Sequence, residues 1–434
     1  RLSVAVDGGR VADAGFEASG CGSMVAAASA AVELVREAPL LDAARVGARE
    51  IAGELGGLSP GKLHAADLAA DALARALGEG AFRDAAAPPS PGRVVVAMSG
   101  GVDSAVAALR CAREPGAEAV AVTLELWRDP ENDGERSCCS ASAVRTARAL
   151  ARRMGLPHLT LDLRDAFRAG VVEPWVAEHA QGLTPNPCVR CNGHVRLDAM
   201  LELARRVGGE SLATGHYARV DQESGLLQLA ADPAKDQAYM LAALAPETLA
   251  RLRFPLGELT KPEVRAIAAE HDLPVAQTPD SQDLCFLAGT GRQAFLARHG
   301  GPRERPGDIV DRAGRRLGAH RGHHLFTVGQ RRGLAVGGTG EPLYVLATDA
   351  RANTVTVGPK AALATVAVRV RGVRLHRPEH EVDAVKLRYR SAPVACTLRE
   401  GRLALAEPVD GASPGQTAVF LSGDRVLGYA TIVA

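Results

Sequence analysis

The segment VVVAMSGGVDS, residues Val94–Ser104, joins a run of apolar residues to two glycines flanked by serines. The apolar run is typical of a buried strand, and the residues after it have helical patterning. Gly100 and Gly101 let the backbone approach a ligand, and the amides at the start of the next helix favour an anion there. The hydroxyls of Ser99 and Ser104 add hydrogen bonds. The segment therefore predicts a phosphate-binding loop.

This loop lacks the lysine that ends a Walker A motif, so transfer of a terminal phosphate is a poor explanation. A structural Gly-Gly turn would explain the glycines but not the Ser, Asp and Ser around them. The motif SGGVDS after a hydrophobic strand resembles the pyrophosphate loop (PP-loop) of the ATP pyrophosphatases. The resemblance implies that ATP is cut between its α- and β-phosphates, with adenylation of an acceptor oxygen and release of pyrophosphate.

Strand and helix patterns alternate around the loop. The alternation predicts an α/β domain with a parallel sheet covered by helices on both faces. We place this PP-loop domain at residues 93–295. Its expected strands are Val94–Met98, Ala119–Leu126 and Leu159–Leu163, and its expected helices are Ala105–Arg113 and Ala141–Met154.

A smaller α+β unit precedes this domain at residues 1–82. It opens with a strand-like alternation and continues with alanine-rich helical stretches at Ser23–Val35 and Leu68–Leu77. Because Arg1 already lies within the alternation, we expect residues once to have preceded it. Prolines and alanines at residues 83–92 predict an extended linker between the two units.

The C-terminal part of the chain is rich first in loops and then in strands. Residues 296–364 are glycine-rich and basic, which predicts a small central domain. Residues 365–434 alternate as strands do and predict a small, closed or nearly closed antiparallel β-barrel. Its expected strands are Val366–Leu375, Ala384–Tyr389, Thr417–Leu421 and Val426–Ile432.

The composition narrows the class of protein. Basic and acidic residues nearly cancel, 51 against 50, so a polyanion site must be a local patch. The segment Arg303–Arg332 is such a patch, since eight arginines against three acidic residues give 8 − 3 = +5. No apolar run approaches the roughly 20 residues that cross a bilayer, so we expect a cytoplasmic protein without a membrane partner. Its eight cysteines favour thiol chemistry or metal ligation over a disulfide scaffold.

Two of these cysteines lie three positions apart in a proline-rich turn. The segment TPNPCVRCN at Thr184–Asn192 contains Cys188 and Cys191, a pair that can bind metal or exchange sulfur. No second CxxC pair exists to complete a zinc site, and the remaining candidate partner is Cys285. For an isolated cysteine, the default interpretation is a small buried apolar residue.

A series of motifs supports a more specific resemblance. The motifs are TPNPxxxCN at Thr184–Asn192, ATGHYAR at Ala213–Arg219, KDQAYML at Lys235–Leu241, DSQDLCF at Asp280–Phe286, GAHRGHHLFTVGQRRGL at Gly318–Leu334 and PGQTAVF at Pro414–Phe420. Together they resemble the tRNA-specific 2-thiouridylases of the bacterial MnmA type, from about Arg93 to the C-terminus.

The resemblance implies roles for individual residues. Cys191 would be the nucleophile and Cys285 the carrier of a persulfide. The nucleotide site would comprise Ala97, Met98, Ser99, Gly100, Gly101, Val102, Asp103, Ser104, Leu124 and Gly215. The target base would meet Asn186, Pro187 and Cys188, and the tRNA would meet His216, Lys235, Asp236, Gln237, Arg388, Tyr389 and Gln416. The Arg303–Arg332 segment would contact phosphates.

The implied reaction is a tRNA-uridine 2-sulfurtransferase activity. The wobble uridine of a tRNA of the lysine, glutamate or glutamine type leaves its stack, and its O2 attacks the α-phosphate of ATP. Sulfur from a persulfide on Cys285, supplied by a donor such as a cysteine desulfurase or a relay protein, then replaces that oxygen. Cys191 attacks the persulfide and forms a disulfide with Cys285. Mg²⁺ is expected with the pyrophosphate, and the sequence does not identify its ligands.

Cys188 leaves a second mechanism open. Well-known members of the family often have Asp at this position, so Cys188, Cys191 and Cys285 can instead be the ligands of an iron–sulfur cluster with one open iron. Anaerobic purification with iron analysis distinguishes the two mechanisms. Thr146, where an acidic residue is common, and the adjacent Cys138-Cys139 pair have no mechanistic interpretation, and we treat them as structural.

The N-terminal unit resembles the iron–sulfur scaffold proteins of the IscU and NifU type. The resemblance depends on FEASGCGS at residues 16–23, ELGGL at 54–58 and KLHA at 62–65. Of the cluster ligands only Cys21 and His64 remain, and Ala65 occupies the position of the last cysteine. We hypothesise a degenerate scaffold that docks a cysteine desulfurase and brings sulfur close to Cys285. The alternative is a stabilising or vestigial domain.

Two other classes of function compete with thiolation. An amide-forming ATP pyrophosphatase would not need Cys191 and Cys285 and would usually have an ammonia route, of which the sequence shows no sign. A non-catalytic iron–sulfur carrier would transfer its cluster without ATP, and the loop would then be only structural.

Overall fold

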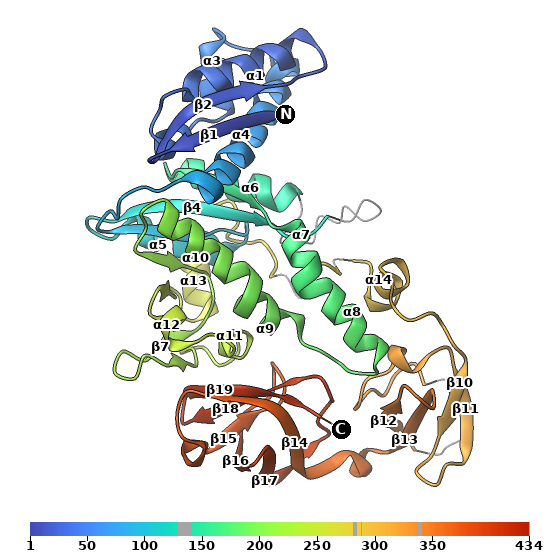
Figure 1. Cartoon of the computed structure of the whole chain (residues 1–434). Coiled ribbons are helices and arrows are strands. Elements are labelled where there is room, and N and C mark those ends of the chain that lie inside the picture. The colour runs from blue at the N-terminus through green and yellow to red at the C-terminus, as the bar shows by residue number, and fades with distance from the viewer. Residues whose placement is uncertain (129–140, 281–283, 288, 335, 337–340, 434) are drawn as a thin grey trace.

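The computed structural model describes residues 1–434 except 129–140, 281–283, 288, 335, 337–340 and 434. The predicted Cys138-Cys139 pair and part of the DSQDLCF motif lie outside the described residues. An N-terminal unit, a domain with a central parallel sheet, a small β-rich unit and a barrel follow one another along the chain (Figure 1). No helix in the described part of the chain is both long and apolar enough to cross a membrane.

The central sheet confirms the predicted α/β fold. Its five strands are all parallel and run in the order β5-β4-β3-β6-β9. The strands are β3 (Arg93–Ala97), β4 (Glu118–Glu125), β5 (His158–Asp162), β6 (Ser211–Ala213) and β9 (Leu252–Arg253). The phosphate loop follows β3, which lies in the middle of the sheet.

Helices cover both faces of this sheet, as predicted. Side chains of β3 alternate between two cores: Val94 and Val96 pack with residues of α5 and α13, whereas Val95 packs with residues of α4 and α10. A strand covered on both faces reads as a continuous apolar run, which explains the sequence of β3. The helices of this domain are α5 (Val102–Ala112), α6 (Ala141–Arg153), α7 (Arg164–Phe167), α8 (Glu173–Ala180), α9 (Pro187–Cys191), α10 (Leu197–Arg206), α11 (Ala238–Leu241), α12 (Pro246–Leu249) and α13 (Lys261–Glu270).

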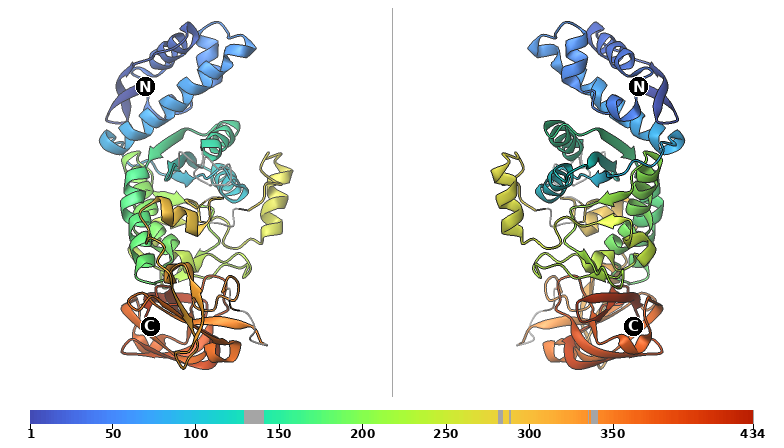
Figure 2. Two further views of the ribbon diagram at one scale, coloured as in Figure 1. Left: turned by 90° about the vertical axis from the view of Figure 1, so that its right-hand side faces the viewer. Right: turned by 90° about the vertical axis from the view of Figure 1, so that its left-hand side faces the viewer.

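The N-terminal unit is an antiparallel hairpin packed on helices. Its elements are β1 (Leu2–Asp7), β2 (Arg10–Phe16), α1 (Gly22–Val35), α2 (Leu40–Ala43), α3 (Ala48–Glu54) and α4 (Leu63–Asp84). The long helix α4 lies between the hairpin and the central sheet (Figures 1 and 2). A Cβ at Gly80 would lie 3.0 Å from Val6 Cγ2, and one at Gly78 would lie 2.0 Å from the carbonyl oxygen of Thr160 on β5. These glycines let one helix contact both units closely.

The segment predicted as a linker lies against the PP-loop domain. The amide of Ala87 donates to the carbonyl of Arg206 over 2.9 Å, and the amide of Ser90 donates to Gly208 over 2.9 Å. Its first two residues still belong to α4, which ends at Asp84, and the rest is hydrogen-bonded to the chain at the end of α10.

The two C-terminal units are β-rich. After α14 (Arg292–Arg298), the central unit forms a four-stranded sheet in the order β11-β10-β13-β12. Its strands are β10 (Gly307–Val310), β11 (Arg316–His320), β12 (Leu343–Asp349) and β13 (Thr354–Pro359). The last unit is the predicted barrel, closed by pairing of its first and last strands. Its strands are β14 (Ala364–Leu375), β15 (Ala384–Lys386), β16 (Val394–Arg399), β17 (Arg402–Asp410), β18 (Thr417–Ser422) and β19 (Arg425–Ile432).

The barrel is continuous with the PP-loop domain. The short strands β7 (Arg219–Val220) and β8 (Leu227–Gln228) pair with each other, and β8 pairs with β19. In addition, Lys386 Nζ lies 2.9 Å from Asp236 Oδ2, and both side chains are buried. The barrel is thus held directly beside the loops that carry several predicted site residues.

Candidate functional site

The predicted phosphate loop connects β3 to α5 and is closed by its own serines. The Ser104 hydroxyl donates to the carbonyl of Gly101 over 3.0 Å, and the Ser99 amide donates to Ser104 Oγ over 3.1 Å. Gly101 precedes the first residue of α5, and no side chain caps the helix there. The first amides of α5 therefore remain available to an anion such as pyrophosphate.

Neighbouring elements approach this loop so closely that glycine is required. Gly100 has φ +80°, and a Cβ there would lie 2.6 Å from the carbonyl oxygen of Ala143 on α6. A Cβ at Gly215, which follows β6, would lie 2.8 Å from the amide nitrogen of Ser104. Leu124 lies at the carboxyl end of β4, beside the loop's own strand. The predicted nucleotide residues thus gather at the carboxyl edge of the sheet, where open α/β sheets bind ligands.

Asp103, in the loop, contacts a lysine that the sequence did not reveal. Lys261, the first residue of α13, places Nζ 2.7 and 2.8 Å from the two carboxylate oxygens of Asp103. The hydroxyl of Tyr217 donates to Asp103 Oδ1 over 2.9 Å. Burial, followed by the charge of Asp103, raises the pKa of Tyr217, so this phenol stays protonated. The loop lacks a Walker lysine in its own sequence, but folding brings a lysine to it.

The cysteine pair lies on the short helix α9. The side chain of Asn186 caps this helix by accepting from the amide of Cys188 over 3.0 Å, and Pro187 occupies its first position. Cys191 ends the helix and is buried, whereas Cys188 is partly exposed. The adjacent Asn192 is buried and donates to the carbonyl of Met240 over 3.2 Å. The predicted nucleophile is therefore held by a capped and anchored turn.

Cys285 lies in a separate segment that packs against the same core as Cys191. It is partly exposed and is followed by Phe286, which is 3% exposed. The ring of Phe286 meets those of Trp175 and Phe295 at centroid distances of 5.2 and 5.0 Å. Cys191 belongs to, and Cys285 packs against, a large apolar core that extends from the N-terminal unit to the barrel.

The alternative iron–sulfur site does not fit this arrangement. Within the ranges that the structure describes, no group of three or more His, Cys, Asp or Glu side chains is arranged to hold a metal ion. Cys188, Cys191 and Cys285 are all among the described residues and form no such group. The three thiols are therefore not arranged as ligands of one cluster.

Several residues expected to touch tRNA are engaged in contacts within the chain. Asp236 is buried against Lys386, and Gln237 Oε1 accepts from the amide of Tyr217 over 3.0 Å. Lys235 Nζ lies 2.7 Å from Asp280 Oδ2. In this structure Asp236 therefore joins the PP-loop domain to the barrel, whereas Lys235 and Gln237 make contacts within the PP-loop domain.

The remaining expected tRNA contacts have mixed surroundings. His216 is buried, and burial lowers its pKa to about 3, so it is neutral at physiological pH. Gln416 Nε2 donates to the carbonyl of Thr184 over 2.6 Å, which joins the barrel to the cysteine loop. Arg388 donates to the carbonyl of Gly411 over 2.8 Å. Tyr389 lies 6.2 Å from the ring of Tyr239, measured between centroids.

The basic segment Arg303–Arg332 is partly neutralised locally. Three ion pairs within it are Arg315–Asp311, Arg316–Asp308 and Arg321–Glu304. The other five arginines of the segment are all exposed: Arg303, Arg305, Arg312, Arg331 and Arg332. The central unit thus presents positive charge that a polyanion can reach.

The N-terminal unit keeps its two predicted residues at the surface. Cys21 precedes α1 and is exposed, and His64 is exposed in the first turn of α4. A hydrogen bond from the backbone of Met24 is the main cause that lowers the pKa of the Cys21 thiol. Ala65, at the expected position of the last cluster cysteine, is buried.

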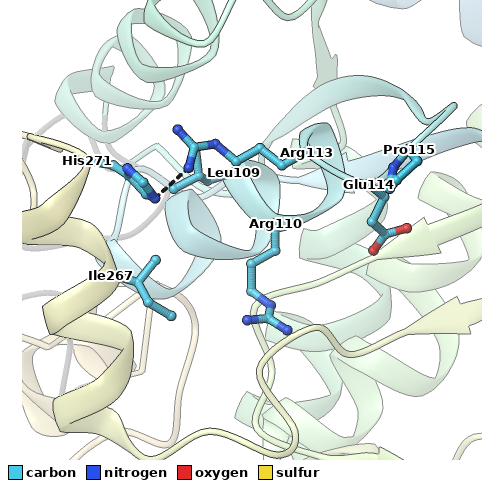
Figure 3. Close-up of a pocket in the computed structure, with 7 residues that line it drawn as sticks. All are labelled: Leu109, Arg110, Arg113, Glu114, Pro115, Ile267 and His271. Carbon is cyan, nitrogen blue, oxygen red and sulfur yellow. Dashed lines mark hydrogen bonds between the residues drawn. The ribbon is translucent and has the colours of Figure 1, made fainter.

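A hollow of about 400 Å³ lies between the C-terminal half of α5 and α13 (Figure 3). Its lining includes Arg110, Arg113 and Ile267, and Arg113 contacts His271 across it. None of the predicted site residues lines it. The phosphate loop lies at the opposite end of α5, so this hollow is not the nucleotide site.

Family models match consecutive parts of the chain. A NifU-like N-terminal domain matches residues 1–85, and a tRNA methyl transferase HUP domain matches residues 92–289. A tRNA methyl transferase PRC-barrel domain matches residues 293–359, and an aminomethyltransferase β-barrel domain matches residues 367–432.

Curated relatives are similar over most of the chain. A bifunctional protein NifU/MnmA from Rubrobacter xylanophilus is 45% identical over 430 residues, which is 96% of this chain and 87% of the relative. A tRNA-specific 2-thiouridylase MnmA from Zymomonas mobilis is 44% identical and covers 79% of this chain and 93% of its own length. Another from Thermus thermophilus is 44% identical, with 78% of this chain and 94% of its own length covered.

Proposed function

The chain belongs to the family of MnmA-type tRNA-specific 2-thiouridylases with a NifU-like N-terminal domain, and we propose that it converts the wobble uridine of tRNA to 2-thiouridine with ATP. One observation carries the proposal. The self-closed loop lies at the carboxyl edge of a parallel sheet, in the same domain as Cys191 and Cys285.

In the first step the loop would hold ATP for adenylation. The amides of α5 and the hydroxyls of Ser99 and Ser104 would bind the pyrophosphate portion, and Leu124 would contact the nucleoside. Uridine O2 attacks the α-phosphorus, the bond to the β-phosphate breaks, and pyrophosphate leaves. The charge on the leaving pyrophosphate would be neutralised by Mg²⁺, while Asp103 stays paired with Lys261 and Tyr217.

In the second step sulfur would replace the activated oxygen. Cys191 attacks the inner sulfur of a persulfide on Cys285, a Cys191–Cys285 disulfide forms, and hydrosulfide is released. The hydrosulfide adds to C2 of the uridine, and AMP leaves with the former O2. Burial of Cys191, and of Phe286 beside Cys285 in the chain, would keep water from competing for the activated base. A reductant then restores both thiols.

The remaining roles concern partners. We propose that Asn186, Pro187 and Cys188 contact the flipped base. The tRNA, of the lysine, glutamate or glutamine type, would lie across the exposed arginines of the central unit. Lys235, Asp236, Gln237, His216, Arg388, Tyr389 and Gln416 would support this surface, and some would exchange their internal contacts for tRNA. The reaction would take place in the cytoplasm.

The N-terminal unit is proposed to dock a sulfur donor such as a cysteine desulfurase. It presents four large apolar side chains that are 37 to 52% exposed, namely Phe16, Val25, Leu63 and Leu68. A Leu63→Asp substitution should slow thiolation driven by desulfurase and cysteine without slowing thiolation driven by added sulfide. Equal rates with desulfurase for both proteins would refute docking at this surface.

The site of ATP cleavage tests the first step. With ATP labelled in the α-phosphate, we expect labelled AMP and unlabelled pyrophosphate in amounts that match the thiolated uridine, and only when tRNA is present. Formation of ADP and inorganic phosphate would contradict the assignment of the loop.

A further inference from the structure

A buried lysine joins the phosphate loop to the segment that leads to Cys285. Lys261 is 7% exposed. Its Nζ lies 2.7 Å from Asp103 Oδ1 and 2.8 Å from Asp280 Oδ1. One ammonium group therefore bridges a carboxylate of the loop and a carboxylate at the start of the DSQDLCF motif.

The Asp280 end of this bridge is strongly held. In addition to Lys261, Lys235 lies 2.7 Å from one oxygen of Asp280, and Arg265 lies 3.0 Å from the other. Burial alone would raise the pKa of Asp280, but hydrogen bonds from Lys235 and Lys261 lower it to about 2. Asp280 is thus ionised at neutral pH, and three cations hold it in place.

Cys285 follows Asp280 by five positions in the chain. Five residues of chain span at most about 18 Å. On the far side of Cys285, the ring of Phe286 is fixed between Trp175 and Phe295. In the sequence, Cys285 is therefore flanked by an ionic anchor at Asp280 and an aromatic anchor at Phe286.

Through Asp103, Lys261 is also attached to the proposed nucleotide site. Asp103 is the second residue of α5 and accepts from Tyr217 as well as from Lys261. Removing the buried ammonium would leave two facing carboxylates without their shared counter-ion, which is costly in a partly buried site.

We propose that Lys261 is a positioning residue that fixes the phosphate loop and Cys285 relative to each other, so that the activated uridine and the persulfide meet in the correct geometry. The inference deepens the proposed function and rests on it. Because a misplacement of about 1 Å can cost about a hundredfold in rate, a shared tether is a physically reasonable means of coupling two centres.

Four variants test this role in the full-length protein. In Lys261→Gln we expect kcat for thiolation to fall at least tenfold and KM for ATP to rise at least threefold, because both carboxylates lose their tether. In Asp280→Asn, which keeps the Asp103–Lys261 pair, kcat should fall while KM for ATP changes less than twofold. Lys261→Arg should recover at least half of the lost kcat. Arg265→Gln is the control: it removes one cation from Asp280 but none from Asp103, and its kinetics should stay within threefold of wild type.

The outcomes separate this inference from the proposed function. If the wild-type protein forms no thiouridine, both fall. If the wild type is active and Lys261→Gln matches it per folded molecule, with only a lower melting temperature, the positioning role is refuted and the function stands. An equal loss in Arg265→Gln would also refute it, because the effect would then be a general loss of charge balance at Asp280.

Discussion

Gly215 determines how closely the end of β6 approaches the phosphate loop. A Cβ at this position would lie 2.8 Å from the amide nitrogen and 3.0 Å from the Cα of Ser104. Because Ser104 closes the loop through Ser99 and Gly101, an added methyl group should displace the whole loop. We expect Gly215→Ala to weaken ATP binding roughly tenfold or more, which corresponds to about 1.4 kcal/mol. Isothermal titration calorimetry with ATP measures this directly.

The control for this substitution is Gly61→Ala in the N-terminal unit. No atom lies within 4 Å of a Cβ at Gly61, so ATP affinity should not change. An unchanged affinity in Gly215→Ala as well would contradict the placement of the nucleotide.

His158 on β5 should make stability depend on pH. Burial, followed by the charges of Arg148 and Arg152, lowers its pKa to about 3, so the folded protein holds it neutral. In the unfolded chain the histidine takes up a proton near pH 6.5. The folded protein therefore has its full stability above that pH, and it loses stability as the pH falls from 6.5 towards 3. At a pH of about 5.5 the loss from one such histidine is about 1.4 kcal/mol.

Urea unfolding at a pH of about 7.5 and of about 5.5 checks this contribution. The free energy of unfolding of wild type should fall more between the two conditions than that of His158→Gln, by about 1.4 kcal/mol. Identical pH dependence of the two proteins would show that His158 is not held neutral in the folded state.

Individual site residues could be predicted where their chemical groups are adjacent in the chain. Gly100, Gly101 and the two serines of the loop form a motif that can be recognised from the sequence alone. Lys261 does not, because it lies 158 positions from Asp103 and only the packing of α13 brings it there. The TPNP turn could likewise be recognised from the sequence, whereas the pairing of Asp236 with Lys386 in the barrel could not. The roles assigned to the site residues remain predictions.

Helix α4 is the element that couples the N-terminal unit to the PP-loop domain. A Cβ at Gly78 would lie 2.0 Å from the Thr160 carbonyl oxygen, so any side chain there must push α4 away from β5. Gly78→Ala should lower the free energy of unfolding by about 1–3 kcal/mol. In an open helical position the same change favours the helix by up to about 1 kcal/mol.

Gly53→Ala on α3 supplies that comparison, since no atom lies within 4 Å of its Cβ. Denaturant unfolding of the two variants should shift in opposite directions, or leave Gly53→Ala unchanged. A stabilised Gly78→Ala protein would mean that α4 does not touch the sheet as described.

Among the strands, those with the clearest alternation of apolar residues were predicted, and two strands of the barrel were missed. β16 and β17 bury only Cys396 and Leu398, and Leu403 and Leu405, among polar or small neighbours. Such short alternation is a weak signal on its own. Their identity as strands depends on partners elsewhere in the barrel, which the sequence does not show.

The whole molecule has a core that crosses the boundary between the N-terminal unit and the PP-loop domain. Apolar residues of α4 such as Leu73 and Leu77 belong to one cluster with Val95 and Leu159 of the sheet. An ion pair joins Arg75 to Glu125 over 2.6 Å at the same interface. Removing residues 1–85 would therefore uncover one face of the sheet. All the predicted unit boundaries remain predictions. The boundary between the N-terminal unit and the PP-loop domain runs through a core that both of them share.

Calorimetry tests this coupling. The N-terminal unit and the PP-loop domain should unfold in one transition, and the protein lacking residues 1–85 should melt at a lower temperature than the full chain. Leu68→Ser is the control, because Leu68 is 52% exposed on α4 and should leave the transition in place. A separate N-terminal transition, with the rest of the profile unaltered by deletion, would contradict a shared core.

Cys191 and Cys285 are central to the proposed activity, because both must act on one ATP-activated uridine. Mass spectrometry of nucleosides from tRNA, after incubation with ATP and a persulfide source, tests this directly. Wild type and Cys396→Ser, whose cysteine is buried in the barrel, should both form 2-thiouridine. Cys191→Ser and Cys285→Ser should form less than a hundredth as much while remaining folded. Undiminished 2-thiouridine in either of these variants, or its absence with wild type, would contradict the account.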